Sequence, residues 1–371
     1  MRKRLTALAV ACCLLFAACG GEAASPSPSP SDSPSPTVSP SPSPEVTTTP
    51  EPTPEVYTGP VNPLTGLPMD GKWVNARPIA IMLNNLVAAQ PQLGQSKADI
   101  IYEVLAEGGI TRMLGVYQTV EGVGMMGSVR SARTYYLELA LGHDAVYLHA
   151  GGSPDAYDKI KAWNVTALDC VNGPYEGSKP GSNLFWRDAD RIRNNGSVHS
   201  VVTTGDTILE KFAGYSFRQE HEEGYTYTQQ FAADGTPAGG VSAVTVKVPF
   251  SSYKHGLFEY DEESGKYLVT QYKQPYIDGN DDSQVAVTNV VVIKTDCHVI
   301  PGDDAGRLDV DLTSGGEGWY ACGGKAIPIT WSKADRNSPF VYRDEAGAEI
   351  VMGQGNSYVN IVPLDCDVTM E

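Results

Sequence analysis

A proline-rich stretch near the N-terminus limits how much of this chain can fold. Residues 25–60 hold twelve of the 26 prolines in the sequence, mostly in Ser-Pro and Thr-Pro repeats. Proline fixes its own φ angle and disfavours the α conformation of the residue before it, and this stretch has almost no apolar side chains to bury. The pattern predicts an extended polyproline II spacer, about 110 Å long at roughly 3.1 Å per residue. Folding therefore begins near residue 61.

The residues before this spacer are typical of a secretory signal that ends in a lipid-attachment site. Residues 2–4 are basic, and residues 5–18 form an uncharged, mostly apolar run, shorter than the ~20 residues that a spanning helix needs. Small residues precede Cys19, as they precede the modified cysteine in the lipobox of bacterial lipoproteins. We expect a signal peptide over residues 1–18, lipid on Cys19 that anchors the chain to the cell membrane, and an extracytoplasmic tether over residues 19–60. The alternative is an ordinary signal peptide that is cleaved nearby.

The net negative charge of the chain disfavours some classes of partner, nucleic acids above all. The formal net charge is −17, and removing the three basic residues of the signal and the five acids of the tether changes it to −15. Nucleic-acid binding depends on clustered Lys and Arg that neutralise phosphates, so we expect no nucleic-acid partner. An anionic ligand would need a local basic pocket.

The first half of the folding part alternates between strand and helix patterns. Continuous apolar runs predict buried strands, and Ser153-Pro154-Asp155 is a typical helix start, with a capping side chain, a proline and an acid in the first turn. The expected strands are residues 78–83, 100–105, 110–117 and 145–150, and the expected helices are residues 131–141 and 154–163.

The second half has almost only strand patterns, which are rich in β-branched residues and separated by Gly, Asn and Asp clusters. We expect an α/β fold of the α+β type, with an α/β domain over residues 61–215 and a β-rich domain over residues 240–371. The alternative places the break near residues 213–239 inside one compact body. The expected strands are residues 241–248, 266–272, 285–294, 318–322, 326–331, 341–342 and 357–362.

Four cysteines remain beyond the anchor, and an even number in an exported chain is compatible with two disulfides. Cys297 follows one expected strand and Cys322 ends another, which favours the pairs Cys297–Cys322 and Cys170–Cys366. Free buried thiols are the alternative. Zinc is disfavoured because CxxC spacing is absent, and we expect no metal and no cofactor.

The best candidate for a binding site lies at the expected starts of two helices. Helix N-termini present free N–H groups and partial positive charge, and two arginines there would add forked donors for a carboxylate or phosphate. The alternative is that these arginines form structural ion pairs with Glu103, Glu107 or Asp155. The predicted ligand-binding residues are Asn84, Glu103, Ser128, Arg130, Ser131, Arg133, His149 and Ser153.

The sequence supports two catalytic interpretations and a calcium site less well than it supports the binding site. A hydrolase would use Ser128, Ser131 or Ser153 with His149 and Asp155, but no Gly-x-Ser-x-Gly elbow is present. A glycosidase would pair Glu103 with Glu107. The acidic residues 278–282 lack the distal glutamate of a calcium loop, so a solvated turn is favoured there.

Several short blocks, in order, resemble the YerB-like bacterial lipoproteins, a family of unknown function. The resemblance covers nearly all of residues 62–371 and implies a lipoprotein with two adjoining domains of a layered β/β/α kind. Where the family usually has Pro-His-Asn, this chain has Val198-His199-Ser200, so a role for this position does not carry over. The blocks are Asn62-Pro63-Leu64-Thr65-Gly66, residues 77–85, residues 98–103, Gly127-Ser128-Val129-Arg130-Ser131-Ala132-Arg133, His149-Ala150-Gly151-Gly152-Ser153, Phe185-Trp186-Arg187-Asp188 and residues 353–358.

Together these patterns favour a non-catalytic envelope lipoprotein that binds a cell-wall fragment or an envelope protein near Arg130, Arg133 and His149. The first alternative is a cell-wall hydrolase or transferase that uses His149 as a base. The second is a structural or regulatory partner of a membrane enzyme. The resemblance implies no activity, so the sequence leaves these three open.

Overall fold

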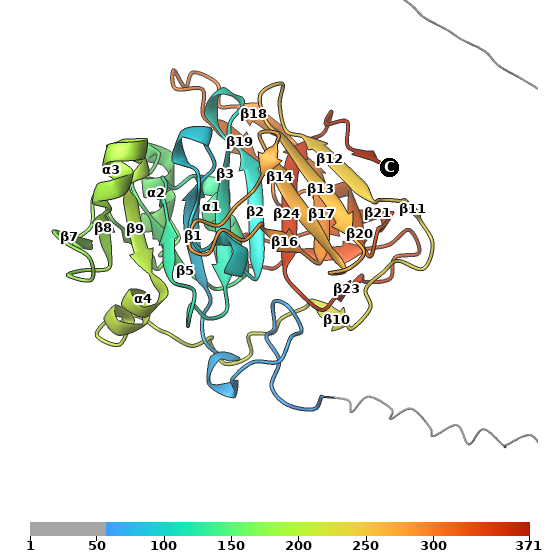
Figure 1. The fold of residues 1–371 in the computed structure, drawn as a ribbon, viewed down its shortest axis with the longest axis horizontal. Helices are drawn as coiled ribbons and strands as arrows, with labels where there is room; N and C mark the ends of the chain where they lie inside the picture. The colour runs from blue at the N-terminus through green and yellow to red at the C-terminus, as the bar shows by residue number, and fades with distance from the viewer. Residues whose placement is uncertain (1–56) are drawn as a thin grey trace, which may run out of the picture. The chain divides into compact units, whose positions relative to one another are not determined.

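The computed structural model describes residues 57–371, which belong to one compact unit (Figure 1). The expected signal peptide, Cys19 and all but the last four residues of the expected tether lie outside the described residues. None of the described helices is long and apolar enough to cross a membrane.

An eleven-stranded sheet runs through the middle of the unit and joins the two halves of the sequence (Figure 1). β24 (Ser357–Pro363), from the end of the chain, lies between β2 (Ile100–Leu105) and β17 (Asn289–Thr295) and is parallel to both. The division into two domains near residues 215–240 stays a prediction. The other strands of the sheet lie on either side of these three. They are β20 (Gly316–Cys322), β21 (Lys325–Ser332), β11 (Val241–Ser242) and β22 (Val341–Arg343) on one side, and β3 (Thr111–Tyr117), β1 (Ile79–Asn84), β5 (Val146–His149) and β6 (Ala167–Asp169) on the other.

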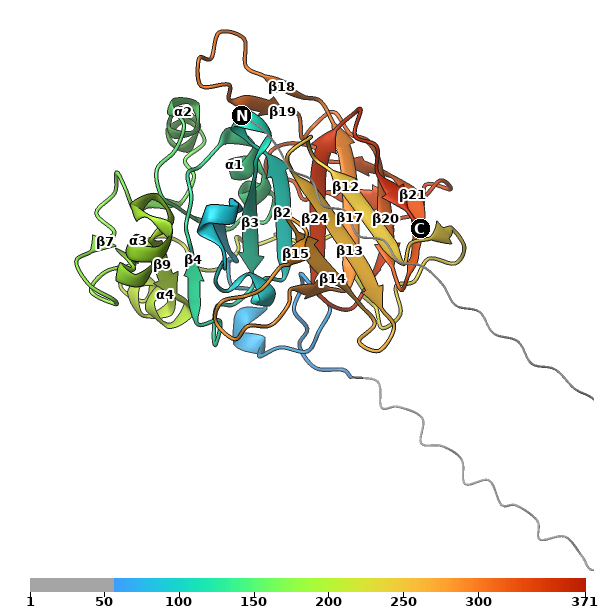
Figure 2. The ribbon, with the colours of Figure 1, turned by 45° about the horizontal axis from the view of Figure 1, so that its top comes forward.

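The central sheet is covered on both faces, which explains why its strands are continuous apolar runs. In β1, Ile79, Ile81 and Leu83 face a core shared with Val246 and Phe258 of a second sheet. Figure 2 shows this second sheet packed over the central strands. It contains β12 (Thr245–Pro249), β13 (His255–Asp261), β14 (Lys266–Gln271), β15 (Gln274–Pro275), β16 (Ala286–Val287) and β25 (Thr369–Met370).

The opposite face carries the helices and completes the layering. Ala80 and Met82 of β1 belong to a second core with Tyr136 of α1 (Thr134–Gly142) and Ala156 of α2 (Pro154–Ala162). Because side chains alternate between the faces of a strand, the central strands β1, β2 and β3 each contribute to both cores. The expected α+β fold in β/β/α layers is therefore confirmed.

Smaller elements surround these layers. A four-stranded sheet beside the first half carries α3 and α4 with it (Figure 1). Its strands are β4 (Met125–Gly127), β9 (Val201–Thr204), β8 (Phe185–Arg187) and β7 (Glu176–Gly177), and the helices are α3 (Ala189–Asn195) and α4 (Gly205–Phe212). Two separate strand pairs complete the fold. They are β10 (Gln230–Ala232) with β23 (Val351–Gly353), and β18 (Cys297–Val299) with β19 (Leu308–Val310).

Neither expected disulfide is formed: all four described cysteines are free. β17 and β20 are antiparallel, with Val290 opposite Ala321, so Cys322 lies at one end of β17 and Cys297 beyond the other. Eight residues of strand separate these ends by about 26 Å. Cys170 follows β6 and Cys366 follows β24, which are five strand spacings apart, or roughly 24 Å. Disulfides need Cα atoms within ~7 Å.

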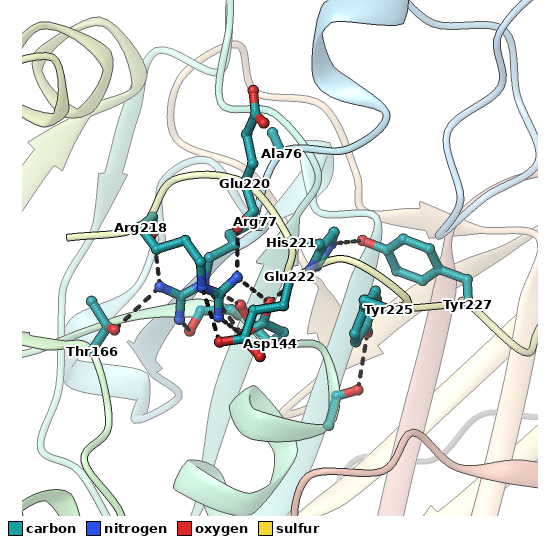
Figure 3. A network of polar contacts seen from close by, with 12 residues as sticks. Ala76, Arg77, Asp144, Thr166, Arg218, Glu220, His221, Glu222, Tyr225 and Tyr227 are labelled. Carbon is teal, nitrogen blue, oxygen red and sulfur yellow. Dashed lines mark hydrogen bonds and ion pairs between the residues drawn. The ribbon is translucent and has the colours of Figure 1, made fainter.

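The chain between the two halves is held to the central sheet by Asp144, which follows α1 (Figure 3). Arg218 donates to both carboxylate oxygens of Asp144 at 2.6 Å, and His221 Nδ1 lies 2.9 Å from Oδ2. Arg77 Nε lies 3.4 Å from Oδ1 and also donates to the Asp144 carbonyl. His221 continues the network to Tyr227 at 2.6 Å.

Replacement of Asp144 by alanine should destabilise the fold by roughly 2 kcal/mol at neutral pH. Burial raises the pKa of Asp144, but hydrogen bonds from Arg218 and His221 and the charge of Arg77 outweigh it and lower the pKa to about 2. A depressed folded-state pKa means that this stabilisation is complete above about pH 4 and is lost as the pH falls towards 2. Urea unfolding at pH 7 and pH 3 would measure both effects. Asp158→Ala, on the exposed face of α2, is the matched control, and equal losses in the two variants would contradict the prediction.

Candidate functional site

A cleft of about 690 Å³ lies at the carboxyl ends of the parallel strands β1, β5 and β6. Strand carboxyl ends are where ligands usually bind in sheets of this kind. Four segments of chain form its walls. They contribute Val129, Arg130 and Ser131, then Ala150, Gly151, Gly152 and Tyr157, then Val171 and Asn172, and finally Arg187, Ser197, Val198 and Val201.

Arg130 is the half-buried cation of this cleft. Its backbone is fixed by hydrogen bonds between its N–H and Met82 O at 2.9 Å and between Ala150 N–H and its own carbonyl at 3.0 Å. Within residues 57–371 its guanidinium makes no ion pair, and its buried Nε has no hydrogen-bond partner. Burial, followed by the charges of Arg112 and Arg133, lowers the pKa of Arg130 to about 10, which still leaves it cationic at neutral pH. A charge held in this way is stabilised when an anion binds.

Arg187 brings a second guanidinium to the cleft from β8. Its Nε donates to Glu176 at 3.0 Å and its Nη1 donates to the Ser197 carbonyl at 2.9 Å, so the side chain is oriented but only partly neutralised. The sequence did not predict Arg187 as a ligand-binding residue. The Phe185-Trp186-Arg187-Asp188 block of the family resemblance was the signal that pointed to it.

Arg133 does not share the cleft with Arg130. Its guanidinium pairs with Glu107, which also binds Arg112 at 3.1 Å, and this is the structural ion pair weighed as the alternative. The expected helix begins only at Thr134, and Arg133 itself has the extended angles φ −137° and ψ 156°. Residues three apart share a face on a helix but point to opposite sides of an extended chain. The two arginines are therefore separated, and Arg133 lines a different cleft of about 510 Å³.

Ser153 and His149 serve the local structure, and Ser131 lines the cleft. Ser153 Oγ accepts from Ala156 N–H at 3.2 Å and caps α2. His149 is only 1% exposed, and its Nδ1 lies 2.8 Å from the Gly151 carbonyl. Burial lowers the pKa of His149 against the opposing effect of Asp169, which favours the neutral imidazole, and His149 does not line the cleft.

Asn84 and Ser128 lie deeper than expected. Asn84 Nδ2 is 2.7 Å from Nδ1 of His199, the middle residue of the Val198-His199-Ser200 segment in which both flanking residues depart from the family pattern. Burial and the charges of Arg130 and Arg191 lower the pKa of His199. Ser128 is completely buried, and its hydroxyl has no partner among the described residues.

Glu103 belongs to the core and not to the cleft. Its side chain is 0% exposed, and Lys254, equally buried, places Nζ 2.8 Å from Oε1. Glu107 forms ion pairs with Arg112 and Arg133, so the structure does not bring the two glutamates together as a glycosidase pair.

The acidic turn at Asp278, the alternative calcium site, is also structural, since this carboxylate accepts hydrogen bonds from the N–H groups of Gly94 at 3.1 Å and Ser96 at 3.0 Å.

Comparisons with known proteins agree with this architecture. Residues 64–218 match the family model "Protein of unknown function (DUF3048) N-terminal domain", and residues 246–359 match its C-terminal domain. The chain is similar to "Putative lipoprotein YerB" of Bacillus subtilis (strain 168), with 33% identity over 307 residues that cover 81% of this chain and 86% of the relative. It is also similar to the crystal structure of the YerB protein from Bacillus subtilis, with a TM-score of 0.70, 29% identity, and coverage of 83% of this chain and 99% of the other.

Proposed function

This chain belongs to the DUF3048 family, whose models describe no activity, and we propose that it is a membrane-anchored envelope lipoprotein that binds an anionic cell-wall fragment without catalysis. The ligand would occupy the cleft between Arg130 and Arg187. The anchor would be lipid on Cys19, and the tether would carry the folded unit beyond the membrane surface.

The observation that carries this proposal is the unpaired state of Arg130. Three described arginines near the cleft pair with a carboxylate: Arg112 and Arg133 share Glu107, and Arg187 contacts Glu176. Arg130 alone among these four lacks a carboxylate partner within residues 57–371, although the chain has a formal net charge of −17. In a protein with so many acids, a cleft that keeps one guanidinium free favours an external anion.

The other walls of the cleft suit a ligand that is only partly charged. The apolar side chains of Val171 and Val198 are 49% and 54% exposed beside it, and Tyr157 offers a ring. Its volume of about 690 Å³ falls within the range of small-molecule sites, which is roughly 300–1,000 Å³. A short peptide with a free carboxylate, as occurs in cell-wall fragments, would combine these contacts.

A non-catalytic role is supported by the position of His149. A general base must reach the group that it deprotonates. His149 is buried, its Nδ1 is engaged with Gly151, and it does not line the cleft.

Arg130→Ala is expected to weaken binding of a soluble muropeptide at least tenfold, because a hydrogen-bonded charge contributes about 1.5–3 kcal/mol. Isothermal titration of the full chain would measure the change. Arg193→Ala is the matched control, since Arg193 lies on α3 and its side chain is 66% exposed. Equal affinities of the two folded variants would rule out this site. Failure of the unmodified protein to bind any cell-wall fragment would instead direct attention to an envelope protein partner.

A further inference from the structure

The core contains a charged cluster that the proposed binding site does not use. Glu103 on β2 and Lys254, in the turn between β12 and β13, have fully buried side chains, and Lys254 Nζ lies 2.8 Å from Glu103 Oε1. Asn85, the residue after β1, is also 0% exposed, and its Nδ2 lies 2.9 Å from the same Oε1 atom. An amine and a carboxamide therefore meet on one carboxylate oxygen.

Burial favours the neutral, reactive form of Lys254, whereas the two aromatic rings near Nζ favour the ammonium. Nζ lies 5.2 Å from the ring centroid of Phe250 and 5.5 Å from that of Tyr272. Burial lowers the pKa of Lys254 and is the largest influence on it, while the charge of Glu103 acts in the opposite direction. A buried amine with a lowered pKa can lose its proton to a neighbouring carboxylate and become a nucleophile.

We propose that Lys254 and Asn85 form an intramolecular isopeptide bond, with Glu103 as the proton carrier. Glu103 first takes one proton from the Lys254 ammonium. The neutral Nζ then attacks Cγ of Asn85, the new C–N bond forms, and the bond between Cγ and Nδ2 breaks. Of the three ammonium protons, one stays on the new amide, one leaves on the ammonia molecule, and one remains on Glu103. No oxidant, metal or cofactor is required.

The two ends of the Asn85 amide differ: Nδ2 also donates to Thr111 Oγ1 at 2.8 Å and lies 3.0 Å from Gln271 Oε1, whereas Oδ1 is buried and has no hydrogen-bond partner among the described residues. Rotation of the amide by half a turn exchanges Oδ1 and Nδ2 and places the oxygen beside Oε1 of Glu103. A protonated Glu103 then donates to Oδ1 and polarises the carbonyl that Nζ attacks.

The bond would stabilise the fold because of the two segments that it joins. It joins the end of β1, in the first half, to a turn of the second sheet, in the second half. None of the described cysteines forms a disulfide that would link these parts. A covalent cross-link between distant residues restricts the unfolded chain and so stabilises the folded one. This proposal is independent of any ligand in the cleft.

The test is a mass measurement on the full chain, purified from membranes and digested with trypsin. Trypsin does not cut after an acylated lysine or between Arg77 and Pro78. The bond therefore predicts one branched peptide in which residues 73–97 are linked to residues 248–266, lighter than the two peptides together by one ammonia molecule. A digest of the natively folded chain that contains residues 73–97, 248–254 and 255–266 only as three separate peptides would overturn the proposal without any variant.

Three variants and one control check the assignment. Lys254→Met and Asn85→Ala should each abolish the branched peptide, while Lys273→Met, at an exposed lysine near Tyr272, should retain it. Glu103→Gln should leave the two segments separate even where the protein folds, because glutamine cannot carry the proton. Persistence of the branched peptide in folded Glu103→Gln would refute the role of Glu103.

Discussion

In an Asn85→Ala background, where Lys254 cannot be cross-linked and stays an ammonium, Glu103→Gln is expected to lower the free energy of unfolding by about 3–5 kcal/mol, the cost of removing one partner of a buried ion pair. Glutamine has nearly the same shape as glutamate, so the loss reports the charge and not a cavity. The variant leaves the Lys254 ammonium at 0% exposure without its counter-charge, and it weakens the hydrogen bonds that Glu103 accepts from Thr111 and Tyr358. Urea unfolding at pH 7, followed by tryptophan fluorescence, would measure the change.

Two further variants test whether the loss comes from the buried charge of Glu103 or would follow the removal of any carboxylate. Glu259→Gln removes an exposed carboxylate on β13 and should change stability by less than about 1 kcal/mol. The double change of Glu103 and Lys254 to Met should recover part of the loss, because apolar pairs of similar size can replace buried ion pairs. An effect of Glu103→Gln no larger than that of Glu259→Gln would show that the pair adds no stability.

The second large effect is expected from acid, through His143 at the end of α1. Burial, followed by the charges of Lys333 and His221, lowers the pKa of His143 to about 3, and the neutral ring is held by the Tyr102 hydroxyl at 2.8 Å from Nε2. The folded-state pKa is below the unfolded value of about 6.5. The stability that neutral His143 provides is therefore complete above pH 6.5 and is lost as the pH falls towards 3, on the order of 1.4 kcal/mol per pH unit.

The comparison with His143→Gln isolates this contribution. Between pH 6.5 and pH 4.5, the unfolding free energy of the unmodified protein should fall by roughly 2 kcal/mol more than that of the variant. Asp99 acts in the opposite direction: burial raises its pKa to about 6, so its contribution to stability increases as the pH falls from 6 towards 4. Because Asp99 is present in both proteins, it cancels in the difference. His298→Gln, at an exposed histidine, is the control, and parallel pH curves for all three proteins would sink the prediction.

Local patterns in the sequence predicted most of the layered fold. Continuous apolar runs gave the strands of the central sheet, since both of its faces are covered, and Ser153-Pro154-Asp155 marked the start of α2. These signals work because helix caps and strand burial depend on residues that are close in sequence. The same reasoning placed the first helix three residues too early. Residues 129 and 132 are instead bridged to Leu83 and Gly152, partners that are distant in the sequence.

The candidate site was only partly predictable for the same reason. Arg130 and Ser131 do line the cleft, but Arg133 points away, because the extended conformation of their segment is imposed by neighbouring strands. Arg187 reaches the cleft from β8, more than fifty residues further along the chain. No local spacing connects it to Arg130.

The sequence by itself determined the features that depend on local pattern, such as the alternation of strands with helices in the first half, while the proline-rich spacer and the anchor at Cys19 stay predictions. The tertiary structure alone decided which side chains meet. It placed Lys254 on Glu103, separated Cys297 from Cys322 at opposite ends of β17, and left Arg130 without a carboxylate in the described part of the chain. The physical reason is that strand order and register set long-range contacts, and a short stretch of sequence specifies its own conformation but not its distant partner.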